Sequence, residues 1–229
     1  MLDRVERTTL QEQVYSRLKI GLMSGQFDPG EAVTLKRLAS DLGTSIMPVR
    51  DALRRLTADG AFEAEPHRSI RVPVMSRQRF FELSETRALI EGHAASLAAE
   101  RISPEELDAA RTANLNMAEA LKPGDTPTVT AENQRFHFII YRAARNDTIL
   151  PIIESLWLQA GPYIVSLHRK TTARPDIGPR WNNHAMGCHD AMVAALEARD
   201  PERAAQAVAE DIRHAASHYD AALAGGNGG

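Results

Sequence analysis

The segment from Leu35 to Leu56 constrains the fold of this chain most, because it predicts two short helices joined by a tight turn. Gly43 stands where a residue with left-handed backbone would end the first helix. Ser45 is placed to cap the second helix. We therefore predict helices over residues 35–42 and 45–58, arranged as a helix-turn-helix.

Elements on both sides extend this segment to a winged helix-turn-helix. Apolar residues that recur every four positions predict another helix over residues 9–24. After the helix-turn-helix, a turn at Asp59-Gly60 precedes two predicted strands, residues 61–64 and 70–74. Three helices followed by a hairpin are the plan of a winged helix.

The rest of the chain has the apolar period of helices, which we predict at residues 77–101, 104–121, 128–145, 149–169, 182–199 and 201–223. The expected fold class is therefore mainly α, with an N-terminal winged helix-turn-helix and a C-terminal all-helical antiparallel bundle. We place the two domains at residues 1–75 and 76–224, and we expect residues 225–229 to form a flexible tail.

The composition fits two domains in a reducing compartment. With 229 residues, 43% of them hydrophobic, the chain is long enough to bury a core in each domain. It has neither an apolar stretch long enough to span a membrane nor the layout of a signal peptide, so we expect a cytoplasmic protein with no membrane partner. The single cysteine, Cys188, cannot form an internal disulfide and is expected to pack as a small apolar residue.

The formal net charge of −3 argues against a protein that coats nucleic acid by bulk attraction. Residues 1–75 carry 11 basic and 10 acidic side chains. If this domain binds DNA, its basic groups must be concentrated on one face. Arg50 and Arg54 meet that requirement, because they are four residues apart on the second helix of the helix-turn-helix and lie opposite its apolar residues.

Four ordered segments of the first domain resemble the GntR family of regulators: residues 11–15, 25–30, 38–45 and 48–56. An isolated arginine-rich stretch would indicate only a solvated helix face, but motifs in this order favour DNA binding. The resemblance and the shared arginine face together imply that double-stranded operator DNA is contacted by Lys36, Ser45, Ile46, Arg50, Arg54, His67 and Arg68. Ile46 stands where arginine is common and Ser69 where a wing glycine is usual, so we expect an atypical operator.

Helix geometry brings potential metal ligands of the second domain together. Asn133 and His137 are four residues apart and can reach a common point. If the chain reverses at residues 200–201, His189 and Asp211 each lie about 16 Å along antiparallel helices that rise 1.5 Å per residue. These two side chains would then be level with each other.

Residues 80–220 also resemble the FCD ligand-binding domain of the FadR subfamily, through segments that include 85–91, 133–137 and 189–195. Many members bind a divalent metal, and the resemblance implies the ligand positions Asn133, His137, His189 and Asp211. Asparagine replaces the usual aspartate, and aspartate replaces the usual last histidine. The resulting set suits zinc, nickel or manganese. The alternative is a polar pocket without a metal, and His184 and His214 are reserve ligands.

Arg87 supports two interpretations, because it lies one turn before Glu91. It either forms an intrahelical ion pair or binds an anionic effector through its guanidinium group. The aromatic residues Trp157, Trp181 and Tyr163 belong either to the core or to a pocket wall.

These features predict a homodimeric transcription regulator whose two winged helices read the halves of a near-palindromic operator. A small organic acid bound in the helical domain would control operator affinity, with relief of repression as the default and activation left open. One alternative is a metal-sensing repressor, whose operator affinity would respond to metal alone. The other is a metal-dependent hydrolase with a fused winged helix, for which we find no well-placed base or nucleophile, and we therefore expect no enzyme.

Overall fold

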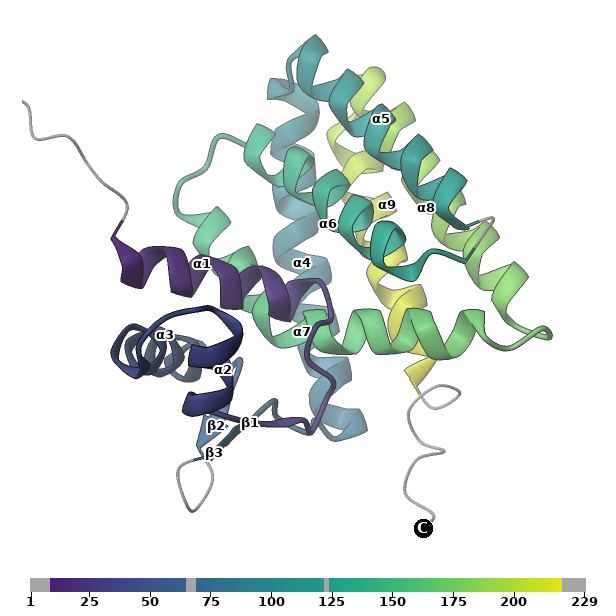
Figure 1. Cartoon of the computed structure of the whole chain (residues 1–229). Coiled ribbons are helices and arrows are strands. Elements are labelled where there is room, and N and C mark those ends of the chain that lie inside the picture. Colours follow the sequence, from purple (N-terminus) through teal and green to yellow (C-terminus); the bar gives the residue numbers. More distant parts are fainter. Residues whose placement is uncertain (1–8, 65–68, 122–123, 220–229) are drawn as a thin grey trace, which may run out of the picture.

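The computed structural model describes residues 9–64, 69–121 and 124–219, and places a small N-terminal domain against a larger bundle of helices (Figure 1). The predicted wing-tip residues His67 and Arg68 and the predicted tail at 225–229 lie outside the described residues. Among the described residues, no helix combines the length and apolar composition that a bilayer-spanning segment needs.

The N-terminal domain is a winged helix-turn-helix, as predicted. Its elements are α1 (Leu10–Met23), β1 (Ala32–Thr34), α2 (Leu35–Asp41), α3 (Ile46–Ala58), β2 (Glu63–Ala64) and β3 (Ser69–Arg71). The side chains of Thr9 and Glu12 form a reciprocal capping box at the start of α1. Gly43, in the turn between α2 and α3, has a φ of +62°, the left-handed conformation that its position required.

The predicted two-stranded hairpin is a three-stranded antiparallel sheet in the order β1-β3-β2. In its register, Val33 of β1 lies opposite Ile70 of β3, and Ala64 of β2 lies opposite the same residue from the other side. Strand β1 was not predicted, because three residues are too few to show a strand period. The strand exists through its pairing with β3, which follows it by more than thirty residues.

Six helices form the C-terminal bundle: α4 (Arg77–Arg101), α5 (Pro104–Leu121), α6 (Thr126–Ala143), α7 (Ile149–Thr172), α8 (Gly178–Glu197) and α9 (Pro201–Ser217). The closest helix pairs are α4 with α9, α5 with α6, and α8 with α9. Helix α7 runs across the direction of α4 (Figure 1).

The bundle helices differ from prediction mainly at their ends. Helix α6 begins at Thr126 rather than at residue 128, and α8 begins at Gly178 rather than at residue 182. Each has a proline in its first turn, where the missing N–H costs no intrahelical hydrogen bond. Helix α9 is described to Ser217, and the last four residues predicted for it lie outside the described range.

The N-terminal domain packs directly on the bundle through α1 and α7. Leu22 of α1 and Trp157 of α7 belong to one continuous hydrophobic core. At the edge of this contact, Lys19 Nζ lies 2.7 Å from Glu154 Oε2. Helix α7 is therefore the element of the bundle that the DNA-binding domain touches most extensively.

Candidate functional site

Helix α3 presents a buried face and an exposed face. Val49, Leu53 and Leu56 are buried in the domain core, whereas Arg50 and Arg54 are exposed. The two arginines thus share the exposed face of α3, where the sequence placed them.

The other predicted DNA contacts in the described chain lie on α2 and at the start of α3. Lys36 on α2 is exposed, and Ile46 is 41% exposed despite being apolar. Ser45 is the N-cap residue of α3, but its side chain makes no capping hydrogen bond. Its hydroxyl is therefore available beside the helix N-terminus, which favours phosphate oxygens.

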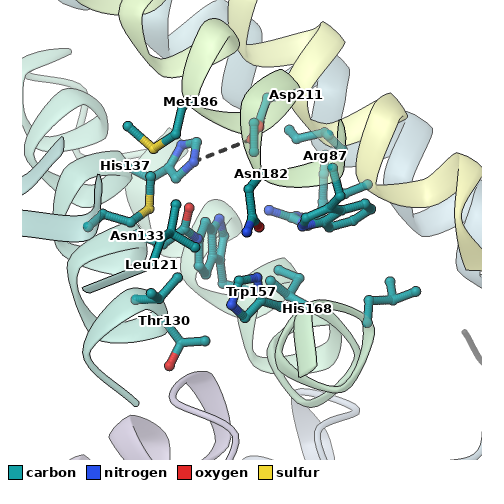
Figure 2. A pocket seen from close by; sticks show the side chains of 18 residues that line it. Arg87, Leu121, Thr130, Asn133, His137, Trp157, His168, Asn182, Met186 and Asp211 are labelled. Atoms are coloured by element: carbon teal, nitrogen blue, oxygen red, sulfur yellow. Dashed lines mark ion pairs between the residues drawn. The ribbon is translucent and has the colours of Figure 1, made fainter. Parts of the chain in front are cut away.

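A buried group of metal-ligating side chains lies in the bundle, and we call it the inner triad: His137 on α6, His189 on α8 and Asp211 on α9. His137 Nε2 is 3.5 Å from Asp211 Oδ2, and His189 Nε2 is 3.9 Å from Asp211 Oδ1. His189 and Asp211 are level on neighbouring helices, as the predicted chain reversal requires. Figure 2 shows His137 and Asp211 turned toward each other.

Hydrogen bonds from outside the triad orient both imidazoles. His137 Nδ1 lies 3.0 Å from the hydroxyl of Tyr141, and that hydroxyl donates to Glu91 Oε2 at 2.5 Å. His189 Nδ1 lies 3.2 Å from Asn114 Oδ1. In both rings an oxygen outside the triad contacts Nδ1, so Nε2 is the atom that faces Asp211.

The charges of the triad fit a cation. Burial lowers the pKa of His189 to about 4, so this ring is neutral at physiological pH. Burial by itself would raise the pKa of Asp211, but the hydrogen bond with His137 and nearby positive groups lower it overall. The Nε2 atoms of both imidazoles and the carboxylate of Asp211 converge, and among the described residues His189 Nε2 has no hydrogen-bond partner. This donor set fits a borderline divalent metal.

The triad opens on a cavity of about 80 Å³. Its wall includes His137 and Asp211 together with Arg87, Asn133, Thr130, Trp157, Ile164, Leu167, His168, Trp181, Asn182 and Met186. Most of the wall is apolar, and its polar groups are spread around it, with Thr130 and His168 lying away from His137 and Asp211 (Figure 2). This volume holds several water molecules or a compact organic ligand.

Arg87 forms the intrahelical ion pair, which is the first of its two interpretations. Its Nε donates to Glu91 Oε1 at 2.7 Å, and one Nη donates to Glu91 Oε2 at 3.3 Å. Arg87 also lines the cavity. A guanidinium group has five N–H donors, so the ion pair leaves donors for a ligand.

Two of the three aromatic residues considered for a pocket line it. Trp157 and Trp181 form part of the cavity wall. Tyr163 instead lies in the core and donates to the carbonyl oxygen of Pro73 at 2.9 Å.

Sequence reasoning missed the residues that orient the triad. Tyr141 follows His137 by four positions, so a helix-spacing argument would have found it. Asn114 and Glu91 lie on other helices and carry no such spacing. His168 and Asn182, which line the cavity, were also not singled out.

Two known family models together match most of the chain. Residues 10–72 match the model of the bacterial regulatory proteins, gntR family, and residues 82–214 match the FCD domain. The chain is 29% identical over 207 residues to the HTH-type transcriptional regulator McbR of Escherichia coli, which covers 90% of this chain and 91% of the relative. It is 31% identical over 226 residues to a probable D-xylose utilization operon transcriptional repressor of Paenarthrobacter nicotinovorans, across 99% and 94% of the two chains.

Solved structures agree with these matches. The structure of E. coli McbR/YncC superposes with a TM-score of 0.80 at 28% identity, over 90% of this chain and 95% of that one. A putative transcriptional regulator GntR from Rhodococcus has the same fold, with a TM-score of 0.71 at 20% identity over 93% and 98% of the two chains.

Proposed function

The chain belongs to the GntR family of transcription regulators and carries an FCD domain, and from this premise we propose that it is a homodimeric repressor released from its operator by a small organic acid. As a family member it is a DNA-binding regulator and not an enzyme. In the proposal, residues 1–75 bind DNA and residues 76–224 bind the effector and form the dimer. Two-fold symmetry of the dimer calls for a near-palindromic operator.

The predicted operator contacts divide into two kinds. We assign Arg50 and Arg54, on the exposed face of α3, to the major groove, where arginine binds guanine or phosphate. We assign Lys36 and Ser45 to the phosphate backbone beside them. Ile46, together with His67 and Arg68 of the wing, completes the proposed DNA-contacting set.

The effector is proposed to be a compact carboxylate in the cavity. Arg87 provides a cationic group with donors to spare, and the apolar wall would accept a short carbon skeleton. Because the cavity volume is only about 80 Å³, a ligand of few heavy atoms fits it best.

The observation that carries the proposal is the position of α7 between cavity and DNA-binding domain. Trp157, Ile164 and His168 of α7 line the cavity. Glu154 and Gly161 of the same helix contact α1. A ligand that shifts α7 would therefore move the winged helix, provided that it binds the DNA-free arrangement more tightly.

A metal in the inner triad is part of the proposal. His137, His189 and Asp211 would hold it, with the amide oxygen of Asn133, and a bound ion would supply a Lewis-acidic position for an effector carboxylate. Zinc, nickel and manganese all accept this donor set. The same triad supports a second candidate function, a repressor whose effector is the metal itself.

Operator binding in the presence of a panel of acids tests these candidates. Genomic fragments retained by the protein are sequenced, and fluorescence anisotropy then measures affinity for the recovered site with each acid, with metal alone and with chelator. An acid that weakens binding in the wild type, but not in Arg87→Gln, supports the proposal. If metal alone changes the affinity and no acid does, the metal-sensing function replaces it. If no discrete site is recovered, both are wrong.

A further inference from the structure

A second group of metal-ligating side chains lies on α8 and α9, beside the inner triad but outside the cavity wall. We call it the outer triad: His184, Cys188 and Glu210. His184 and Cys188 are four residues apart on α8, so both side chains emerge on one face of that helix. Glu210 meets them from α9, which packs along α8.

The ligand atoms are close enough for one ion to join them. His184 Nε2, Cys188 Sγ and a carboxylate oxygen of Glu210 all lie within 4.8 Å of one another. His184 Nε2 and Glu210 Oε1 are 3.8 Å apart. Ligand atoms around a tetrahedral zinc, with bonds of about 2.0–2.3 Å, are roughly 3.5 Å apart, so small side-chain rotations would close the site.

The imidazole of His184 is held in place but lacks a polar partner. Its ring stacks on that of His214, with centroids 3.7 Å apart and an interplanar angle of 29°. The Nε2 atoms of both rings are shielded from solvent and accept no hydrogen bond from any described residue. Buried polar atoms without partners are rare in proteins, and a bound cation would satisfy the lone pair of His184.

The cationic side chain beside the outer triad is already paired. Arg213 lines the surface groove that contains His184, Glu210 and His214. Its guanidinium group, however, pairs with Glu85 of α4, with Nη2 3.0 Å from Oε2. The groove leaves the exposed carboxylate of Glu210 accessible to an ion from solvent.

Cys188 makes the site selective for a thiophilic ion. The thiol is buried and lies beside His184 and Glu210. A divalent ion binds by forming a metal–sulfur bond as the S–H proton leaves to solvent. Calcium and magnesium prefer oxygen ligands and would not displace this proton.

We propose that His184, Cys188 and Glu210 form a second transition-metal site, suited to zinc and related borderline cations, that joins α8 to α9. Cys188 and Glu210 each directly precede a member of the inner triad, His189 and Asp211. An ion in the outer site therefore fixes the relative position of the two helices that carry the inner one. The assignment stands on the outer residues and does not depend on the effector proposal.

Cobalt distinguishes the two sites, because Cys188 is the only cysteine and the inner triad has no sulfur. The metal-free full-length protein is titrated with Co²⁺, and thiolate-to-cobalt charge-transfer absorption is recorded in the near ultraviolet. We expect this absorption to saturate when one cobalt ion per chain occupies the outer site, whether or not the inner triad also binds cobalt, and to be lost in Cys188→Ser. Added Zn²⁺ should displace the cobalt and abolish the absorption.

Glu210 is exposed and His184 is half-buried, so substitutions at these two positions test the site without disturbing the packed core. Glu210→Gln and His184→Ala should each weaken the cobalt affinity read from this absorption by at least about tenfold. His93→Ala, which removes an exposed histidine of α4, should leave it unchanged. Asn133→Ala, which removes the proposed amide ligand of the inner site, should also leave the absorption in place. No charge-transfer absorption in the folded wild type, or equal affinity in Glu210→Gln and His184→Ala, would overturn the site.

Discussion

Gly161 of α7 lies so close to Met23 of α1 that a Cβ atom at position 161 would be 2.8 Å from the Met23 Cα atom. The carbonyl oxygen of Leu22 would be 2.9 Å away. Both neighbours are backbone atoms, so neither can move aside by a side-chain rotation. The absence of a side chain at residue 161 therefore sets the distance between the DNA-binding domain and the helix that lines the cavity.

Gly161→Ala is expected to destabilise the protein for this reason. Overpacking a close contact costs about 1–3 kcal/mol, and the better helix propensity of alanine returns up to about 1 kcal/mol. We expect a net loss of about 1–2 kcal/mol in the free energy of unfolding, measured by urea denaturation. Gly187→Ala in α8 is the matched control, because a Cβ atom there would meet no neighbouring group of the described chain within 4 Å and only the propensity gain applies. Equal stabilisation of both variants would show that α1 and α7 are not in tight contact.

Arg50→Ala should weaken binding to the operator. Arg50 is exposed on α3, and loss of an arginine that reads a base costs about 1–3 kcal/mol of binding free energy. Arg55→Ala removes the same charge from the same helix, but Arg55 lies over the ring of Tyr15, 3.8 Å from its centroid. Anisotropy titrations should therefore show a much smaller change for Arg55→Ala. If the two variants bind equally well, Arg50 is not a specific contact.

The sequence predicted best those features that short-range chemistry determines. Gly43 and Ser45 mark the turn of the helix-turn-helix without reference to any distant residue. The level placement of His189 and Asp211 follows from one chain reversal and the constant rise of a helix. Strand β1 was not predicted, because its three residues are extended through their pairing with the distant strand β3.

Side-chain environments were predictable where one helix contains both partners or where a single chain reversal fixes their level. The ion pair of Arg87 with Glu91 was anticipated from their spacing. Cys188 was expected only to pack as a small apolar residue, whereas the structure places it beside His184 and Glu210. Which side chains of α8 and α9 meet depends on the rotation of each helix about its own axis. The spacing of apolar residues does not determine this rotation accurately enough to predict individual contacts.

Acid should destabilise the protein through His168, which lines the cavity. Burial lowers its pKa from 6.5 to about 4, so the unfolded chain binds a proton between these pH values and the folded protein does not. Stability is therefore lost as the pH falls from 6.5 toward 4, by up to about 2–3 kcal/mol. Arg87 and Asp211 are charged residues that line the same cavity, and both are unchanged in the variant His168→Asn.

His168→Asn should reduce this acid sensitivity, measured as the difference in unfolding free energy between pH 7 and pH 4.5. His93→Asn, at an exposed position on α4, is the control and should retain the wild-type difference. An unchanged difference in His168→Asn would mean that other buried groups determine the pH dependence.

Tyr141→Phe should lower the metal affinity of the inner triad while keeping all of its ligands. The hydroxyl of Tyr141 connects His137 Nδ1 to the carboxylate of Glu91, and so keeps His137 Nε2 directed at Asp211. Loss of such an orienting group costs about 10–100-fold in metal affinity, which we expect for zinc measured by competition with a chelating dye.

Tyr163→Phe removes another buried hydroxyl, one that binds the backbone near residues 73–75 and lies away from the triad. It should lose stability to a similar degree but bind zinc as the wild type does. If Tyr141→Phe binds zinc as tightly as the wild type, the Tyr141 hydroxyl has no role in metal binding. If Tyr163→Phe loses as much zinc affinity as Tyr141→Phe, the loss comes from a general loosening of the bundle.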